Sequence, residues 1–230
     1  MVLYALLIDL IGNGMTAEST FRPRGTVYGT LLNYRREYDA WQSQMNLPPY
    51  RDAPKAPVLY VKPANTWTSS GDTISVPARV TQVEIGASVA AVIGDAGAVA
   101  GYVLVNDLSI PHDSYYRPPV KYNALDGFLG FSDAMRNAAA AGNPAEFKLT
   151  VKVNREVVQT VQFSELVRPA SQLLQDVGEF MTLRPGDWLL LGLDVAKNGY
   201  RPRAQVGDDV EITGTGFVTL KNSLVAEIAV

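Results

Sequence analysis

The sequence contains no cysteine. Disulfide bonds, thiolate nucleophiles and cysteine metal sites are therefore excluded together. Their absence is compatible with a cytoplasmic protein, because thiols stay reduced and disulfides are rare in that compartment, and we expect a cytoplasmic location. Of the 230 residues, 47% are hydrophobic and 19% are charged. This is the composition of an ordinary globular protein, long enough to bury a substantial core.

Histidine is almost as scarce, since His112 is the one histidine of the chain. Any metal site must therefore be built mainly from carboxylates. Any histidine-dependent acid–base mechanism would have to use this residue. His112 follows a proline in a loop, where a histidine is more often structural or solvated than catalytic.

The chain also lacks a strong net charge and a long apolar run. The formal net charge is -3, and no basic cluster is present, so we expect no nucleic-acid partner. The apolar segment Met1–Gly12 lacks a basic flank, contains Asp9 and is too short to span a bilayer. We therefore expect no membrane partner. We interpret residues 1–24 as an N-terminal extension, with Met15 as an alternative start, and residues 25–230 as one domain.

Short apolar segments separated by turns dominate the remainder of the chain, which predicts many strands. Two segments have helical spacing of their apolar residues, Arg35–Met45 and Pro169–Leu183, and the second has Pro169 suited to its first turn. A regular alternation of strand and helix is missing, so we predict an α+β fold. The predicted strands are Thr26–Asn33, Pro57–Lys62, Thr73–Val76, Val83–Gly94, Gly101–Asp107, Phe147–Val153, Trp188–Gly192 and Asp209–Thr213, followed by a hairpin-like end at Gly214–Lys221.

The residues alone offer little chemistry. A serine-hydrolase elbow, a phosphate-binding loop, a dinucleotide fingerprint and an H-E-x-x-H motif are all absent from the sequence. Aspartates at a strand end or beside glycine, namely Asp107, Asp126 and Asp187, are candidate ligands for a hard cation. For each aspartate taken singly, capping of a turn is the more frequent role.

Five stretches, taken in order, resemble the fumarylacetoacetate hydrolase family. The resemblance covers the chain from about Gly25 onward, and it rests on the order and spacing of the motifs together. It implies a mixed β-roll or barrel with few short helices. The five stretches are P-V-L-Y-V-K-P-A-N-T at Pro57–Thr66, V-A-A-V-I-G at Val89–Gly94, G-Y-V-L-V-N-D at Gly101–Asp107, D-G-F at Asp126–Phe128 and L-R-P-G-D-W-L-L-L-G at Leu183–Gly192.

The resemblance implies a divalent cation, magnesium or manganese, held by an E-x-E pair and by the aspartate of the N-D motif. Asp107 matches that aspartate, but Gly86 and Ser88 stand where the two glutamates would be. Glu84 shares the strand face of Gly86, and only a shift of strand register would bring it to the site. A hard cation needs several oxygen ligands and negative charge. We therefore expect Asp107 to be the remnant of a degenerate metal site, and this chain to hold no cofactor of its own.

Other positions of the family's pocket have changed as well. The acid–base histidine of the family's lid falls on Glu37, and the threonine of its late G-T-P loop falls on Leu193. The lysine ahead of the D-G-F motif falls on Asn123, although Lys121 would share its face if the segment were extended. Lys121 and Asp126 remain as weak catalytic candidates, and the catalytic residues otherwise stay unknown.

The loop Tyr115–Pro118 resembles one in the decarboxylase/isomerase branch of the family, which acts in homoprotocatechuate (4-hydroxyphenylacetate) degradation. Tyr116 and Arg117 are candidates for binding a substrate carboxylate through a bidentate contact. Packing of the same loop against a neighbouring subunit is an equally good interpretation, because interfaces favour tyrosine and arginine.

The resemblance implies a subunit of the amino-terminal type from a decarboxylase/isomerase of aromatic catabolism that acts on an oxo-tricarboxylate. We expect this chain alone to be weak or inactive, in a homo- or hetero-oligomer with a metal-bearing paralogue. The alternatives are an independently active hydrolase, hydratase or decarboxylase on 2-oxo or diketo acids that uses Asp107, Glu84 and Lys121, and a module that binds a small 2-oxo di- or tricarboxylate without turnover.

Overall fold

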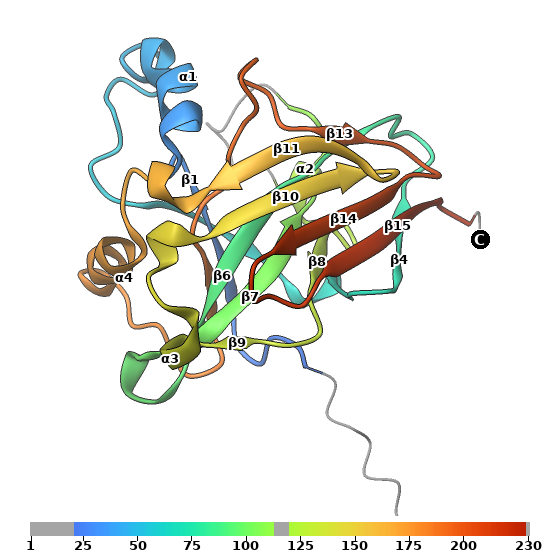
Figure 1. The fold of residues 1–230 in the computed structure, drawn as a ribbon. Helices are drawn as coiled ribbons and strands as arrows, with labels where there is room; N and C mark the ends of the chain where they lie inside the picture. The colour runs from blue at the N-terminus through green and yellow to red at the C-terminus, as the bar shows by residue number, and fades with distance from the viewer. Residues whose placement is uncertain (1–20, 113–119, 229–230) are drawn as a thin grey trace, which may run out of the picture.

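The structure is a computed structural model, and it describes residues 21–112 and 120–228. Two curved β-sheets pack face to face, with short helices at their margins (Figure 1). This arrangement confirms the predicted α+β class and the predicted mixed β-roll with few helices. Most of the predicted strands are present, with ends shifted by a few residues.

The larger sheet has eight strands and is mixed, because β1 pairs with β12 and β3 pairs with β8 in parallel while the other pairs are antiparallel. Its longest pair joins β6 to β7, in a register that sets Ala87 opposite Asn106. The strands of this sheet lie in the order β2 (Val58–Lys62), β1 (Val27–Leu31), β12 (Trp188–Leu190), β6 (Ala87–Ile93), β7 (Val99–Asp107), β8 (Leu129–Phe131) and β3 (Trp67–Ser69). The eighth strand, β9 (Arg136–Asn137), pairs with β7 outside this order.

The smaller sheet has five strands, and a separate pair joins β13 (Arg203–Ala204) to β5 (Val83–Glu84). In the five-stranded sheet, Val157 and Val158 of the edge strand β11 are exposed. The strands lie in the order β11 (Glu156–Gln162), β10 (Lys148–Val153), β14 (Asp209–Gly214), β15 (Leu220–Ala226) and β4 (Thr73–Val76).

Two of the helices exceed two turns, α1 (Arg35–Met45) and α4 (Ala170–Gly178). The prediction for α1 is confirmed, whereas the predicted end of α4 at Leu183 is wrong, since the helix ends at Gly178. The remaining elements are α2 (Val120–Asn123), α3 (Ala138–Ala141) and four 3₁₀ turns, η1 (Ala64–Thr66), η2 (Asp95–Gly97), η3 (Pro144–Glu146) and η4 (Phe163–Glu165). Among the described residues, none of the helices is both long and apolar enough to cross a membrane.

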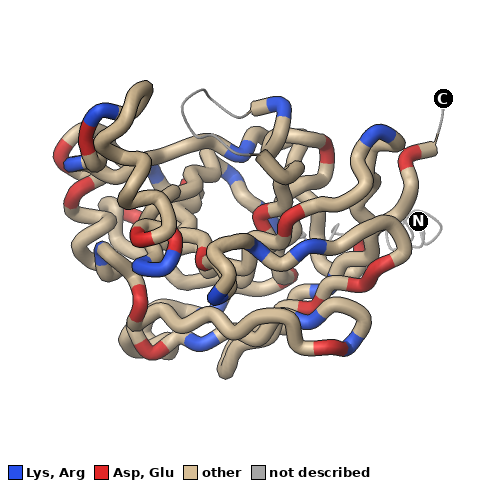
Figure 2. The backbone as a smooth tube through the Cα atoms, turned by 90° about the horizontal axis from the view of Figure 1, so that it is seen from above, with Lys and Arg blue, Asp and Glu red and all other residues tan. Residues whose placement is uncertain are grey.

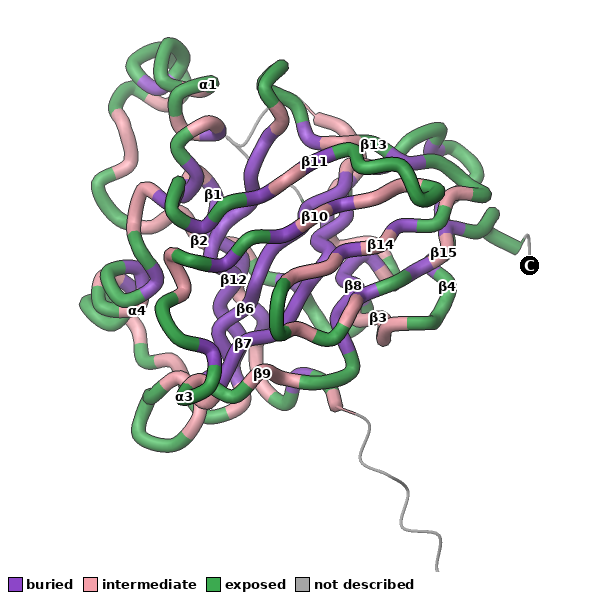
Figure 3. The backbone as a smooth tube through the Cα atoms, in the orientation of Figure 1, coloured by how far each residue is buried: buried purple, intermediate pink, exposed green. Residues whose placement is uncertain are grey.

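The core fills both faces of the eight-stranded sheet. β6 is buried along its whole length, so alternate residues serve two apolar clusters. Val89 and Ala91 face the five-stranded sheet, while Ala90 and Val92 lie with Trp188 on the other side. Figure 3 shows the buried central strands between exposed margins. Acidic and basic residues are intermixed around the chain (Figure 2), in keeping with the small net charge.

Candidate functional site

The end of β7 forms the centre of the candidate site. Asp107 closes this strand and is 2% exposed, beside an enclosed cavity of about 10 Å³. A cavity of this size accommodates about one water molecule. In the described part of the chain, Asp107 is the one acidic residue that lines it, and Ser109 contributes a buried Oγ without a hydrogen-bond partner there. The lining residues are Leu31, Tyr60, Asp107, Ser109, His112, Asn123, Leu193 and Arg201.

Asp107 is engaged by two side chains from β2. The Lys62 Nζ lies 2.7 Å from Asp107 Oδ1, with both side chains at most 2% exposed. The same ammonium donates to the carbonyl oxygens of Leu108 and Asn123, and the Tyr60 hydroxyl donates to Asp107 Oδ2. Burial lowers the pKa of Lys62, an effect that Asp107 opposes, and burial raises the pKa of Tyr60.

The backbone of β1 allows this contact. Tyr60 and Lys62 are two residues apart on β2, so their side chains share one face. Gly29 is paired with Tyr60, and a Cβ on Gly29 would lie 2.0 Å from the tyrosine ring. Only glycine at this position leaves room for the ring to cross β1 and reach Asp107.

Gly86 and Ser88 are the two positions at which the resemblance predicts the family's glutamates. A Cβ on Gly86 would lie 2.3 Å from the backbone oxygen of Asp107, so the strand leaves no room for a side chain. The Ser88 Oγ donates to the Gly192 carbonyl at 2.6 Å. Glu84 lies at the end of β5, with its carboxylate 3.5 Å from Arg203 and outside the lining of the inner cavity.

Glu37, in the first turn of α1, is fully buried. Its Oε2 accepts the Leu32 N–H at 2.7 Å, and its Oε1 lies 3.6 Å from Arg201 Nη2. Burial raises the pKa of Glu37 to about 7, with a smaller increase from Asp194, while Arg201 and the Leu32 N–H oppose the shift. A carboxyl group in this range can exchange protons near neutral pH.

Asp194, in the late loop, is buried and forms an ion pair with Arg36 of α1, whose side chain is 36% exposed. Its Oδ1 also accepts the Val195 N–H at 2.9 Å. Burial raises the pKa of Asp194, and Arg36 opposes the shift. This loop, altered from the family's G-T-P pattern, therefore anchors α1 through an ion pair.

The weak catalytic candidates lie away from Asp107. Lys121 lies in helix α2, so the segment is not extended and the condition for Lys121 to share the face of position 123 is not met. The Lys121 side chain is exposed, with its Nζ 4.8 Å from the centre of the Tyr122 ring. Asp126 is exposed and accepts the Asn65 amide at 2.6 Å. Neither residue lines the inner cavity. The substrate-binding candidates Tyr116 and Arg117 lie outside the described residues.

The remaining predicted residues have mainly structural contacts. The Nδ1 of His112 lies 2.9 Å from the Ile110 oxygen, and its ring stacks on Tyr122. Asp187 accepts the N–H groups of Thr26 and Arg184, which supports the prediction of a turn-capping aspartate.

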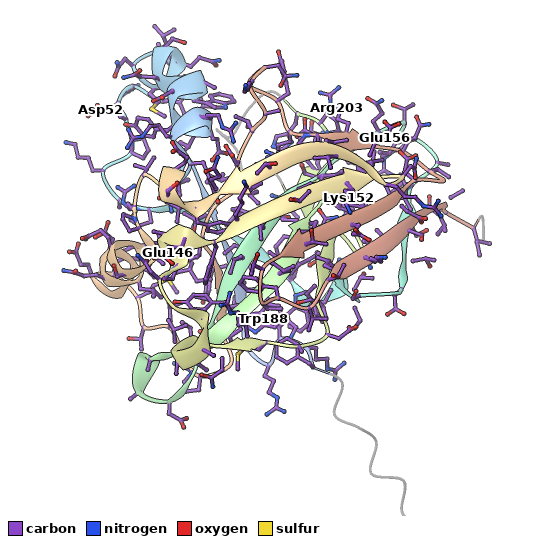
Figure 4. The ribbon with its side chains drawn as sticks, in the orientation of Figure 1. Asp52, Glu146, Lys152, Glu156, Trp188 and Arg203 are labelled. Carbon is purple, nitrogen blue, oxygen red and sulfur yellow. The ribbon has the colours of Figure 1, made fainter. Side chains whose placement is uncertain are left out.

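A second, larger cavity lies beside the inner one and has a volume of about 320 Å³. His112 and Arg201 line both cavities. Arg203, on β13, lines only the larger one and is labelled in Figure 4 beside that strand. We call this larger space the outer cavity.

Sequence reasoning missed Tyr60, Lys62, Arg201 and Arg203. The available signals were a lysine inside a strand-like apolar segment, V-L-Y-V-K, and two arginines that flank Pro202. In the described part of the chain, residues of the His, Cys, Asp and Glu types do not gather in a group of three or more that could hold a metal ion.

Comparison with known proteins places these features in a wider context. Residues 26–225 match the family model described as fumarylacetoacetate (FAA) hydrolase C-terminal. The 4-hydroxyphenylacetate degradation bifunctional isomerase/decarboxylase of Escherichia coli is 35% identical over 214 residues, which cover 89% of this chain and 48% of that protein. The chain therefore spans about half the length of that relative.

Solved structures share the fold. The 5-carboxymethyl-2-hydroxymuconate delta-isomerase of Mycobacterium smegmatis matches with a TM-score of 0.68 and 25% identity, over 89% of this chain and 80% of that one. A fumarylpyruvate hydrolase from Pseudomonas aeruginosa, solved with Mn²⁺ and pyruvate, matches with a TM-score of 0.70 and 20% identity, over 93% and 94% of the two chains.

Proposed function

This chain belongs to the fumarylacetoacetate hydrolase family, and on that premise we propose that it is the amino-terminal-type subunit of an aromatic-catabolism decarboxylase/isomerase. The complete enzyme would decarboxylate an oxo-tricarboxylate of homoprotocatechuate degradation and isomerise the product. This chain would supply the scaffold and a degenerate site, and a metal-bearing paralogue would supply the catalysis.

The length of the match supports a paired arrangement. The match covers 89% of this chain but 48% of the Escherichia coli relative. A relative twice as long has room for two domains of this kind. We infer that the second domain's role falls here to a separate chain, in a homo- or hetero-oligomer.

The observation that carries the degenerate site is the surroundings of Asp107. Among the described residues it is the one carboxylate that lines the inner cavity, and the Lys62 ammonium lies 2.7 Å from it. A divalent cation needs several oxygen ligands and more than one negative charge to offset dehydration. Gly86 and Ser88 supply no carboxylate, and Glu84 faces Arg203 instead. These residues do not fit magnesium or manganese.

The chemistry of the proposed reaction supports the same division of labour. Decarboxylation of an oxo acid produces an enolate, whose charge needs an electrophilic partner. In this chain the Lys62 ammonium is committed to Asp107 and to the carbonyl oxygens of Leu108 and Asn123. The inner cavity, at about 10 Å³, also has no room for the substrate. We therefore assign turnover to the paralogue.

A second candidate function is independent activity as a hydrolase, hydratase or decarboxylase on 2-oxo or diketo acids. Glu37 favours it, because a buried carboxyl group with a pKa of about 7 is suited to proton transfer. It would act at the position of the family's lid histidine. Turnover by the purified chain without a paralogue would distinguish this candidate from the first.

The test compares the purified chain alone with the chain mixed with a metal-bearing paralogue. Mn²⁺ binding is measured by isothermal titration calorimetry, and decarboxylation of the oxo-tricarboxylate is followed with magnesium present. We expect no stoichiometric Mn²⁺ binding and no decarboxylation by the lone chain, and turnover by the pair.

Two variants locate any metal that does bind. Asp107→Asn removes the remnant ligand, and Asp126→Asn removes an exposed carboxylate as the matched control. Full activity of the lone chain, or Mn²⁺ binding lost in Asp107→Asn and kept in Asp126→Asn, would show that the chain is an independent metalloenzyme.

A further inference from the structure

A third cavity has a volume of about 430 Å³, which lies in the range of small-ligand sites. Three cationic side chains from separate parts of the chain line it, those of Arg79, Lys121 and Arg203. Among the described residues, none of those that line it is acidic. The inner and outer cavities differ in this respect, because Asp107 lines the first and Glu84 lines the second. We call this third space the basic cavity.

The turn that carries Arg79 is held in place by two hydrogen bonds. The Val80 N–H donates to the Pro77 oxygen at 2.8 Å, and the Ala78 N–H donates to the carboxylate of Glu227 at 3.2 Å. Val80 is buried, whereas Arg79 beside it is exposed. In the part of the chain that the structure describes, the Arg79 guanidinium forms neither an ion pair nor a hydrogen bond. Its N–H donors are therefore available to a ligand.

Lys121 is held at the basic cavity by the packing of α2. The Tyr122 oxygen accepts the Ile110 N–H at 2.7 Å, and the Tyr122 ring stacks on His112. The Lys121 Nζ lies 4.8 Å from the centre of the same ring, in a cation–π contact. The ring carries no net charge, so the contact places the ammonium without neutralising it. Within residues 21–112 and 120–228, Lys121 forms no ion pair.

Arg203 is the third cation, and it is partly compensated. Its Nη2 lies 3.5 Å from the carboxylate of Glu84, which lines the outer cavity and not the basic one. The backbone of Arg203 is fixed by its pairing with Glu84 in the ladder of β13 and β5. Even with the charge of Arg203 assigned to Glu84, the side chains of Arg79 and Lys121 leave the lining positively charged.

A phosphate group suits this arrangement better than a carboxylate does. A carboxylate has one negative charge on two oxygens, and a single arginine satisfies it in a bidentate contact. A phosphate monoester has a charge of about −1.5 to −2 and three strong acceptor oxygens at neutral pH. Cations from separate segments suit such an ion, because each can contact a different oxygen. Thr81 and Gln82 add a hydroxyl and an amide to the same lining as neutral donors.

We propose that the basic cavity binds the phosphate group of a small phosphorylated molecule, with Arg79 and Lys121 as its main contacts. Val80, Ile110 and Pro111 add apolar surface to the lining, against which the organic part of the ligand would pack. The site uses neither a metal ion nor a paralogue. It therefore goes beyond the proposed function and is tested separately from it.

The test measures binding of phenyl phosphate to the full chain by isothermal titration calorimetry, in metal-free and phosphate-free buffer at neutral pH. Benzoate is the matched probe, because it keeps the aromatic ring and presents a carboxylate in place of the phosphate. We expect saturable binding of phenyl phosphate that is about tenfold or more tighter than that of benzoate, since the phosphate gains an additional charge-assisted contact.

Arg79→Gln and Lys121→Gln each remove one cation from the basic cavity. Both side chains are exposed, so we expect both variants to unfold at the temperature of the wild type. Each should weaken binding of phenyl phosphate about tenfold, since one charge-assisted contact is lost. Arg35→Gln and Lys148→Gln are the matched controls, because they remove the same charges from exposed positions outside the lining. Both controls should leave binding unchanged.

Three results would overturn the proposal. Absence of saturable binding, or equal affinities for phenyl phosphate and benzoate, would show that a phosphate group is not recognised. Unchanged binding in either Arg79→Gln or Lys121→Gln would place the ligand elsewhere. Equal losses in the matched controls would reduce the effect to general electrostatic attraction. None of these results would bear on Mn²⁺ binding or on turnover with a paralogue.

Discussion

The buried pair Lys62–Asp107 gives the sharpest prediction about stability. Lys62→Met keeps a side chain of similar length but removes the ammonium, which leaves the Asp107 carboxylate buried without its counter-charge. Breaking a buried ion pair in this way costs about 3–5 kcal/mol. For a domain of this size each kcal/mol lowers Tm by about 2–4 °C, so we expect a decrease of about 6–20 °C.

Lys221→Met is the matched control. The Lys221 Nζ lies 2.7 Å from Glu211 Oε2, the same distance as in the buried pair, but the side chains are 63% and 25% exposed. Lys152 also contacts Glu211 at 3.1 Å, so that carboxylate keeps a partner. A solvated pair contributes about 0–1 kcal/mol, and we expect the free energy of unfolding to change by no more than that.

Urea unfolding of four chains completes the cycle: wild type, Lys62→Met, Asp107→Asn and the double variant. The double variant contains no unpaired buried charge, so we expect it to be more stable than Lys62→Met alone. The coupling energy of the pair then follows directly. Equal losses in Lys62→Met and Lys221→Met, or no recovery in the double variant, would refute the reasoning that burial makes this pair important.

Two further predictions concern Glu37 and the strand beside Asp107. Because the pKa of Glu37 is raised from 4.5 to about 7 in the folded protein, the folded state binds the proton more tightly. This contribution to the free energy of unfolding is fully present below pH 4.5, and about 3 kcal/mol of stability is lost as the pH rises through 7. Glu37→Gln should flatten the urea midpoint between pH 5 and 8, and an unchanged slope would contradict this. Gly86→Ala should lower the free energy of unfolding by about 1–3 kcal/mol or more through overpacking. Ser88→Ala should lower it by about 1 kcal/mol. Equal losses in urea unfolding would show that the strand can shift to admit the methyl group.

The sequence predicted the buried strands well and the exposed ones poorly. β6 and β7 are found almost where their apolar runs placed them, because continuous burial leaves a continuous apolar signal. β11 was missed, since its outward valines break the alternation and its turn lacks glycine: Asn154 and Arg155 adopt positive φ values of 50° and 73°. The predicted extension of α4 to Leu183 followed apolar spacing, although Phe180 in that extension is 55% exposed.

The site was predictable only where a motif marked it. Asp107, Gly86 and Ser88 were proposed through the resemblance of the β6–β7 segment to the family, and that assignment stays a prediction. Lys62 was missed because lysine is almost never fully buried unless it is paired, and its partner is 45 positions away in the sequence. No local pattern reports a contact between β2 and the end of β7, which depends on how the sheet is ordered.

The inner and outer cavities differ in volume, and the volume limits the size of the molecule that each can hold. The inner one, about 10 Å³, has room for about one water molecule, whereas the outer one, about 320 Å³, has a volume in the range of small-ligand sites. Arg201 lines both cavities, so this side chain lies between the outer cavity and the surroundings of Asp107. Helix α1 lines the outer cavity with Ala40, Trp41 and Gln44, and its buried residues are Glu37 and Met45. Glu37 pairs with Arg201, and Arg36 of the same helix pairs with Asp194, so two ion pairs hold α1 in place.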